Sequence, residues 1–202
     1  PIAKKMAAYF EKIDADLTLA DLQSHEGEWV EPRGVDYHGY TLFELPPNGQ
    51  GFAALMMLKI LKQIDLREFE RGSTEMFHYM VEAKRLAFEA MAGTFADPDF
   101  AKMPIDQLLS DAFAKRQFDR IAQDRVISPS QLAVELEGEG DTTYLTVVDG
   151  DGMMVSLIQS NYRGMGSGLV PTGLGFMLQD RGELFSLEAG HPNVYAPGKR
   201  PF

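Results

Sequence analysis

The sequence predicts an α+β protein whose helices occupy the first part of the chain and whose strands occupy the last part. Apolar residues recur at helical spacing in several segments before Ala122. From Thr142 that period ends, glycine becomes frequent, and β-branched residues fill a short run that closes at Asp149. We therefore expect a helical layer that covers one side of a strand layer.

Five segments carry helix signals. They are Ile2–Lys12, 16–22, 52–64, Ser73–Met91 and Pro104–Ala122. Thr18 and Asp21 have the spacing of a capping pair at the start of the second helix. The segment 52–64 is apolar almost all round, which is typical of a buried helix. Proline suits the first position of the last helix, because its missing N–H has no partner there in any case.

Two hairpins are expected. The first joins strands at Trp29–Pro32 and Tyr40–Leu45 across residues 33–35. The second joins 142–149 to 153–160, because Asp-Gly between two strand-like runs is a strong hairpin signal. The segment Glu135–Gly140, just before this second hairpin, is acidic and rich in glycine, so we expect it to be exposed and mobile.

Composition excludes several classes of function. The formal net charge is −11, which argues against nucleic acid or an anionic membrane as a partner. Without cysteine, the chain has no disulfides, thiolate metal sites or cysteine nucleophiles. It shows no signal peptide and no apolar run that could span a membrane. Since it begins with Pro1 and ends at Phe202 in what reads as mid-domain, we expect an internal piece of a longer protein. That protein is expected to be bacterial, and its compartment, cytoplasmic or periplasmic and secreted, stays open.

Thr142 is a candidate nucleophile because it opens a strand directly after the acidic segment. If the chain were cut before Thr142, its hydroxyl and a free α-amino group would lie on one residue. An α-amino group titrates near pH ~8, so it can act as the base for that hydroxyl. The alternative is an ordinary strand threonine, which is how we interpret Thr143 and Thr146.

Several short motifs follow one another along the chain. Before Thr142 they are 37–40 (Tyr-His-Gly-Tyr), 46–51 (Pro-Pro-Asn-Gly-Gln-Gly) and 95–100 (Phe-Ala-Asp-Pro-Asp-Phe). After Thr142 they are Ser160–Gly168, Gly173–Gln179, His191–Asn193 and Pro197–Phe202. With these motifs in this order, nearly the whole chain resembles the gamma-glutamyltranspeptidase family of N-terminal-nucleophile hydrolases.

The resemblance implies a fold, a division of the chain and a reaction. The fold would be a four-layer αββα sandwich, of which this chain is a fragment. Residues 1–141 would end the large subunit, and residues 142–202 would begin the small subunit. Self-cleavage between Asp141 and Thr142 would free the nucleophile, which would take an acyl group from an amide and pass it to water or an amine. Ser160 matches a family threonine whose hydroxyl hydrogen-bonds the nucleophile.

Three positions bear on the acyl donor. Where glutamyl-transferring members carry a glutamine and paired aspartates, this chain has Arg181, Glu183 and Leu184. Losing one carboxylate and gaining a guanidinium should weaken binding of an ammonium group and favour a carboxylate. We therefore expect the acylase-like branch of the family, with a glutaryl-like acyl group in place of γ-glutamyl.

Tyr195 matches a tyrosine that heads a lid loop in some family members. Here Ala196 to Lys199 follow at once and the lid insert is missing. An open site excludes water less well, so we expect hydrolysis to compete well with transfer.

The expected partners are a small-molecule amide, either γ-glutamyl or glutaryl-like, and the other subunit of a large/small heterodimer formed by processing. No cofactor and no metal are expected, because the four histidines lack metal-ligand spacing. By the resemblance, the oxyanion-hole glycines and paired serines lie beyond Phe202, and the arginine for the substrate's α-carboxylate lies before Pro1. The chain alone is therefore expected to be inactive.

Two other readings stay open. The protein could be an unprocessed homologue that serves as a structural or binding module, which an uncut chain would favour. It could also be a helical interaction domain with a fused hairpin, which would require an exposed apolar groove along its helices.

Overall fold

The computed structural model describes residues 1–127 and 142–202. Its helices are α1 (Ile2–Lys12), α2 (Leu19–Ser24), α3 (Phe52–Leu61), α4 (Thr74–Ala92), α5 (Ile105–Leu108) and α6 (Asp111–Phe118), with 3-10 turns η1 (Leu66–Glu68) and η2 (Arg181–Leu184). Its strands are β1 (Arg33–Tyr37), β2 (Tyr40–Glu44), β3 (Thr143–Val148) and β4 (Met154–Gln159). In this part of the chain, no helix is both long and apolar enough to cross a membrane.

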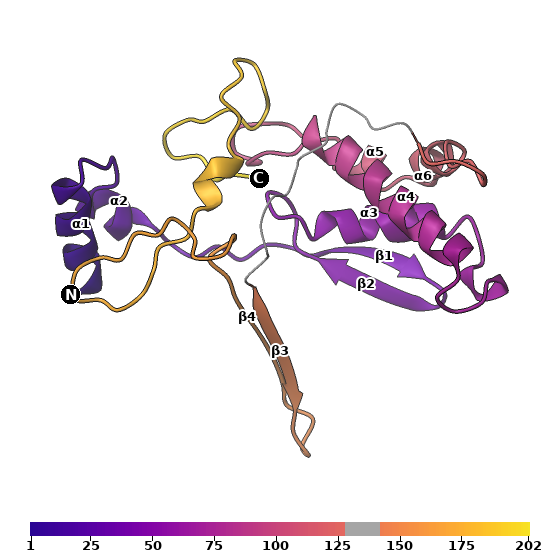
Figure 1. The fold of residues 1–202 in the computed structure, drawn as a ribbon, viewed down its shortest axis with the longest axis horizontal. Coiled ribbons are helices and arrows are strands. Elements are labelled where there is room, and N and C mark those ends of the chain that lie inside the picture. Colours follow the sequence, from indigo (N-terminus) through magenta and orange to yellow (C-terminus); the bar gives the residue numbers. More distant parts are fainter. Residues whose placement is uncertain (128–141) are drawn as a thin grey trace. The chain divides into compact units, whose positions relative to one another are not determined.

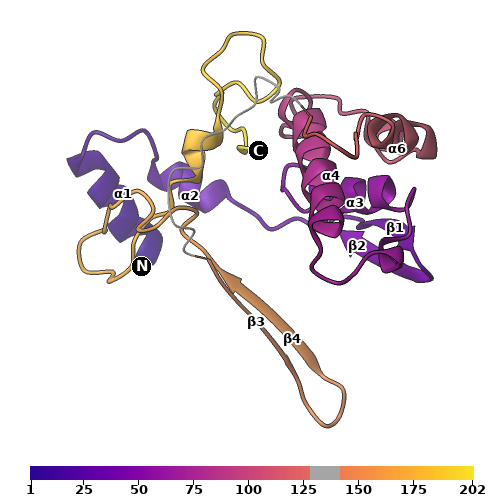
Figure 2. The same ribbon diagram turned by 45° about the vertical axis from the view of Figure 1, so that its right-hand side comes forward.

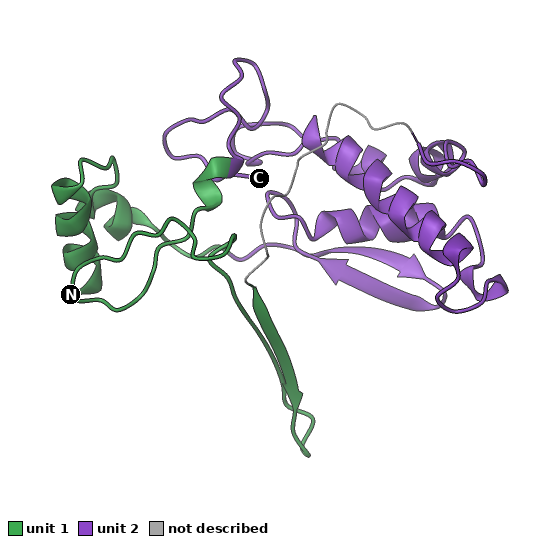
Figure 3. Cartoon of the chain, in the orientation of Figure 1, with its two compact units in different colours: residues 1–28, 135–183 green, residues 29–134, 184–202 purple. Residues whose placement is uncertain are grey.

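The described chain forms two compact units (Figure 3). The first consists of residues 1–28 and 142–183, and the second of residues 29–127 and 184–202. Each unit therefore combines residues from both sides of the predicted cleavage point. The prediction for Asp141 and for the acidic segment falls outside the described residues.

The second unit is built around α3. This helix packs against β1 and β2 on one side and against α4 and α6 on the other (Figures 1 and 2). Phe52, Leu55, Met56 and Ile60 are almost fully buried, as the apolar character of the segment predicts. A helical layer is thus present, but it covers the β1–β2 hairpin. The prediction that it covers the strands after Thr142 was wrong for the described residues, because every residue of β3 and β4 is exposed.

The prediction for the first strand was wrong. Trp29–Pro32 is not a strand, and the Trp29 side chain is fully exposed. The strand lies instead at Arg33–Tyr37, where Val35 pairs with Leu42 and faces the core. A two-residue loop, His38–Gly39, makes the turn, and both residues have positive φ. Such loops match the twist of the paired strands, so the hairpin forms at this point of the chain.

The predicted helix over Pro104–Ala122 is broken in two. Leu109 and Ser110 separate α5 from α6, and the Ser110 hydroxyl accepts a hydrogen bond from the N–H of Phe113 at 3.1 Å. A serine that caps a new helix in this way offers the backbone an alternative to continuing the old one.

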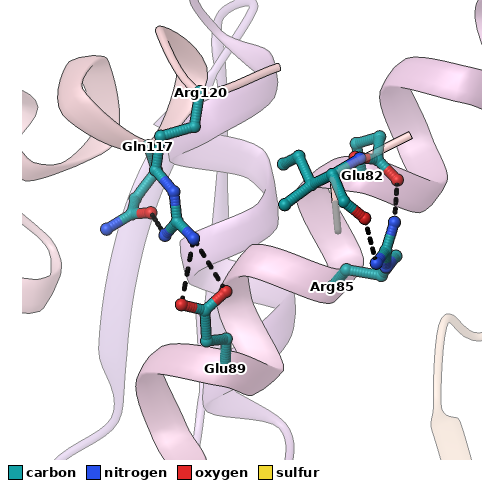
Figure 4. Close-up of polar contacts among 6 residues, drawn as sticks. Glu82, Arg85, Glu89, Gln117 and Arg120 are labelled. Atoms are coloured by element: carbon teal, nitrogen blue, oxygen red, sulfur yellow. Dashed lines mark hydrogen bonds and ion pairs between the residues drawn. The ribbon is translucent and has the colours of Figure 1, made fainter. Parts of the chain in front are cut away.

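Charged residues of α4 hold the segment that follows α6 (Figure 4). The buried Glu82 carboxylate accepts hydrogen bonds from Arg85 and from the N–H of Ile127, at 2.6 and 2.7 Å. Arg85 also donates to the carbonyl of Ile127, so both backbone groups of that residue are satisfied. Glu89 lies one turn after Arg85 in α4, and both of its carboxylate oxygens accept hydrogen bonds from Arg120 at 3.0 Å.

The first unit contains two short helices and the second hairpin. The Thr18–Asp21 capping box is present at the start of α2, as predicted. Strands β3 and β4 pair antiparallel from Thr143↔Gln159 to Val148↔Met154, which confirms the predicted hairpin. Every residue of both strands is exposed, including Leu145, Val147, Leu157 and Ile158.

Candidate active site

The two predicted catalytic residues meet at the open end of the β3–β4 hairpin. Thr142 comes directly before β3 and Ser160 directly after β4, so the strand register sets them opposite each other. Their hydroxyl oxygens, Oγ1 and Oγ, are 2.7 Å apart, within hydrogen-bond distance. The two residues are 18 positions apart in the sequence, and the hairpin brings their hydroxyl groups together.

Ser160 also contacts the chain that follows it. Its Oγ accepts a hydrogen bond from the N–H of Tyr162 at 2.9 Å. With that donor in place, the Ser160 hydroxyl keeps its own proton and a second lone pair for Thr142. The arrangement can orient the Thr142 hydroxyl by hydrogen bonding, which is the role predicted for Ser160.

Tyr162 is a residue of this site that the sequence alone did not indicate. Its φ is 82°, a conformation that is a clear outlier for a bulky side chain, and strained residues of this kind cluster at functional sites. The guanidinium of Arg181 lies 5.0 Å from the centre of its ring, and that of Arg163 lies 6.0 Å away. The aromatic ring is thus close to two cations, and its own N–H is bound to Ser160.

Arg163, the second residue that the sequence analysis missed, is held by two carboxylates. Its N–H and Nε lie 3.3 and 3.4 Å from the two carboxylate oxygens of Asp180, and its Nη2 forms an ion pair with Glu183. The retained acid of the loop, Glu183, is therefore already paired with a cation from its own unit.

Arg181 has different partners, although it shares the η2 turn with Glu183. Its Nε donates to the side-chain carbonyl of Gln179 at 3.1 Å, and its guanidinium stacks near Tyr162. Among residues 1–127 and 142–202, no carboxylate forms an ion pair with Arg181, so its positive charge is not neutralised there.

Gly166 allows the segment Ser160–Gly168 to approach the backbone at Leu178 closely. Its φ is 60°, and a Cβ at this position would lie 2.5 Å from the carbonyl oxygen of Leu178. Only glycine fits such an approach without strain. Ser167 completes the contact, since its N–H and hydroxyl both donate to Leu178 at 2.9 Å. This contact sets Arg163 beside Asp180.

Tyr195, the last predicted site residue, belongs to the second unit. It is exposed, and its ring meets Phe185 edge-on with the centroids 5.4 Å apart. Buried Asn193 supports the same segment by donating to the carbonyl of Leu184 at 2.8 Å and accepting from the N–H of Phe202 at 3.2 Å. Thr142, Ser160, Arg181 and Glu183 lie together in the first unit, and Tyr195 does not.

Three or more acidic or histidine side chains that could hold a metal ion do not occur together anywhere in the described part of the chain. The first unit presents a hydroxyl pair, that of Thr142 and Ser160, and the guanidinium of Arg181, which contacts the Tyr162 ring.

Comparison with known proteins identifies the family. The gamma-glutamyltranspeptidase family model matches residues 1–202, the whole chain. The glutathione hydrolase-like YwrD proenzyme of Bacillus subtilis is 36% identical over 204 residues, and the oxamate amidohydrolase proenzyme of Klebsiella pneumoniae is 34% identical over 202 residues. Both matches cover 100% of this chain, which spans 37% of the length of each relative.

The fold agrees with a solved structure. The crystal structure of cephalosporin acylase from Bacillus halodurans matches with a TM-score of 0.83 and 38% identity, over 98% of this chain and 35% of that one. The expected fold class is confirmed, since this α+β chain is a fragment of an N-terminal-nucleophile hydrolase sandwich. The motifs, the family match and the fold agree, and the chain therefore belongs to the gamma-glutamyltranspeptidase family.

Proposed function

We propose that the protein to which this chain belongs is an amidohydrolase and acyltransferase that uses Thr142 as an N-terminal nucleophile. The observation that carries the proposal is the 2.7 Å contact between the Thr142 and Ser160 hydroxyls at the end of the hairpin. The family match supports it. In this proposal Asp141 and Thr142 flank the cleavage site, residues 1–141 end the large subunit, and residues 142–202 begin the small one.

The reaction would proceed in two steps. The Thr142 α-amino group takes the proton of the Thr142 hydroxyl, whose oxygen attacks the amide carbonyl. The amine leaves with a proton, and the acyl group remains as an ester on Thr142. Water or a second amine then attacks the ester, and the hydroxyl of Thr142 is restored. Ser160 orients the attacking oxygen by its hydrogen bond.

Self-cleavage would create the α-amino group. The Thr142 hydroxyl attacks the carbonyl of Asp141, the peptide becomes an ester, and water opens it to a carboxylate and a free N-terminus. The names of both relatives describe proenzymes, which supports processing of this protein as well.

The experiment that tests processing is a denaturing gel of the full-length protein with intact masses. Wild type should give two chains, with the new N-terminus at Thr142. Thr142→Ala should stay uncut, because it lacks the attacking oxygen, and Thr142→Ser should be cut more slowly. Efficient cutting of the alanine variant would remove Thr142 from its role, and an uncut wild type would favour a non-catalytic module.

For the substrate, we propose an amide whose acyl group ends in a carboxylate, of the glutaryl type. Arg181 carries a positive charge with no ion-pair partner in the described residues, and Glu183 is paired with Arg163. Oxamate, which the name of the Klebsiella relative gives as its substrate, also carries a carboxylate beside its amide. Leu184 offers no charge that could hold an ammonium group. Tyr195, exposed on the second unit, is proposed as a further substrate-binding residue.

The substrate prediction is tested with matched glutaryl and γ-glutamyl anilides. The wild-type protein should hydrolyse the glutaryl anilide at least as well as the γ-glutamyl one. Arg181→Gln should lower kcat/KM for the glutaryl anilide about tenfold or more, since a contact between ions is worth roughly 1.5–3 kcal/mol. Leu184→Asp should move the preference toward γ-glutamyl. A strong γ-glutamyl preference in wild type that Leu184→Asp leaves unchanged would contradict the assignment of this loop.

After cleavage the two subunits would stay together as a heterodimer. Both compact units draw residues from each side of the proposed cut, so breaking one bond leaves their contacts in place. In the second unit, the Asn48 side chain donates to the carbonyl of Pro201 at 2.6 Å, and Arg200 binds Asp97.

A further inference from the structure

We propose that Arg163 sets the acyl-group specificity of this site by neutralising Glu183, which leaves Arg181 as the group that attracts the substrate. Arg163 would act through Glu183 and is a specificity-determining residue, not a catalytic one. The inference rests on the proposed amidohydrolase function and names a determinant of its substrate class.

In the described part of the chain, the ion pairs of the site all involve one of its two arginines, Arg163. Two guanidinium groups, those of Arg163 and Arg181, lie near the Tyr162 ring. The carboxylates of Asp180 and Glu183 both contact Arg163. Asp180 is the better shielded of the two, with 16% of its side chain exposed against 36% for Glu183. Arg163 offsets one of these two negative charges, and its ion pair with Glu183 holds that carboxylate away from the second guanidinium.

Arg181 is the cation of the cluster without a carboxylate partner in the described residues. Its guanidinium lies 5.0 Å from the centre of the Tyr162 ring, and its Nε donates to the side-chain amide oxygen of Gln179. An uncompensated guanidinium attracts a carboxylate and can bind both of its oxygens. If Arg163 did not hold Glu183, that carboxylate would be free to attract an ammonium group, or to pair with Arg181 itself.

The cluster is joined to the nucleophile by a short chain of contacts. The N–H of Tyr162 donates to Ser160 Oγ, which lies 2.7 Å from Thr142 Oγ1. A substitution of Arg163 would change the contacts of Tyr162 and Glu183, which are proposed to affect substrate binding. It would leave the hydroxyls of Thr142 and Ser160 in place. We therefore expect it to alter KM in opposite directions for acyl groups with and without an ammonium.

The test compares kcat and KM of the full-length protein on the glutaryl and γ-glutamyl anilides. Arg163→Gln should lower KM for the γ-glutamyl anilide about three- to tenfold, raise KM for the glutaryl anilide by a similar factor and leave kcat nearly unchanged. Arg163→Lys should keep the wild-type preference, because it keeps the charge. Arg163→Gln combined with Glu183→Gln should lose the γ-glutamyl gain, because no carboxylate is then released.

Arg67→Gln is the matched control, since it removes an exposed arginine from its ion pair with Asp65 in the second unit. It should leave both KM values unchanged. An active, processed Arg163→Gln protein whose ratio of KM values equals that of wild type would overturn the inference. So would a ratio that shifts equally in the single and the double variant.

A binding measurement separates this inference from the proposed function. An uncut protein, or one that hydrolyses neither anilide, would contradict the proposed amidohydrolase function. It would not contradict the inference that Arg163 holds Glu183 away from the substrate. Calorimetric titration with glutarate and with L-glutamate needs no turnover. Arg163→Gln should bind glutamate more tightly and glutarate more weakly than wild type, and equal changes for both acids would overturn the inference.

Discussion

At the scale of single residues, the candidate site depends on a few hydrogen bonds at the open end of the β3–β4 hairpin. Ser160 contacts both the Thr142 hydroxyl and the Tyr162 N–H. In the proposed mechanism the first contact would orient the nucleophile, while the second holds the backbone at a residue with a positive φ. The same side chain thus connects the predicted nucleophile to the charged cluster around Tyr162.

Substitutions of Ser160 test whether the reaction needs its hydroxyl group or only the space that its side chain fills. Ser160→Ala removes a hydrogen bond to the nucleophile, so we expect kcat on either anilide to fall about tenfold, while KM changes little. Ser160→Thr keeps the hydroxyl and should retain most of the activity. Steady-state kinetics of the processed proteins provide the measurement, and an alanine variant with wild-type kcat would show that Thr142 does not need this contact.

At the scale of elements, side-chain contacts hold the turn after α4 against residues 200–202. Asp97, with 1% of its surface exposed, accepts hydrogen bonds from the N–H, Nε and Nη2 of Arg200 at 2.8–3.1 Å. Nearby, the rings of Phe95 and Phe202 meet edge-on at 5.7 Å. Two motifs that carry the family resemblance, 95–100 and Pro197–Phe202, are therefore in direct contact.

The contact between Asp97 and Arg200 should weaken in acid. Burial by itself raises the pKa of Asp97, but hydrogen bonds from Arg200 and from the N–H of Asp99 outweigh it, and the net pKa is lowered. A lowered folded-state pKa stabilises the protein above the unfolded pKa of about 3.9, and that stability is lost as pH falls through the folded value. We expect the free energy of unfolding of the full-length protein, from urea titrations, to decrease below about pH 4.

Substitution of Asp97 provides the control for that pH dependence. Asp97→Asn should lower the free energy of unfolding at pH 7 by about 2 kcal/mol and flatten its acid decline, because a buried charge-assisted contact is lost. Asp99→Asn should change it by less than about 1 kcal/mol, since the Asp99 side chain is 78% exposed and lies 3.6 Å from Arg200. Equal effects of the two variants would mean that the Asp97 contact is not the stabilising one.

At the scale of the whole molecule, the β3–β4 hairpin needs further protein around it. Both of its faces carry exposed apolar side chains, and a two-stranded hairpin is marginal alone in water. The chain spans 37% of the length of its curated relatives, which gives room for the strands that would cover it. We interpret the hairpin as an incomplete part of the central sheets of the sandwich.

The isolated chain should accordingly be inactive. The family resemblance leads us to expect that this chain does not carry the oxyanion donors, and such donors are each worth roughly a hundredfold or more in rate. We expect no turnover of either anilide by the purified 202-residue chain under conditions in which the full-length protein is active. Turnover at the rate of the full-length protein would show that the described residues already form a complete site.

The sequence by itself indicated the family through its ordered motifs, and it predicted the buried helix α3 and the second hairpin from local signals, an apolar run and an Asp-Gly turn. The contact of Ser160 with Thr142 was expected from the family resemblance, and the strand register of the hairpin brings the two hydroxyls together. The sequence also indicated Arg181, Glu183 and Leu184 as the positions where this chain departs from the family pattern. Their specificity roles stay predictions.

Only the tertiary structure decided which groups pair with which. In α4 the apolar Phe77 and Val81 are exposed, whereas the charged Glu82 is buried. Glu82 can be buried because Arg85 and the backbone of Ile127, far along the chain, satisfy its oxygens. In the same way, nothing local to Arg163 shows that it will bind the carboxylates of Asp180 and Glu183. Sequence patterns report the periodicity of one segment, whereas charge pairing depends on contacts that folding creates between distant segments.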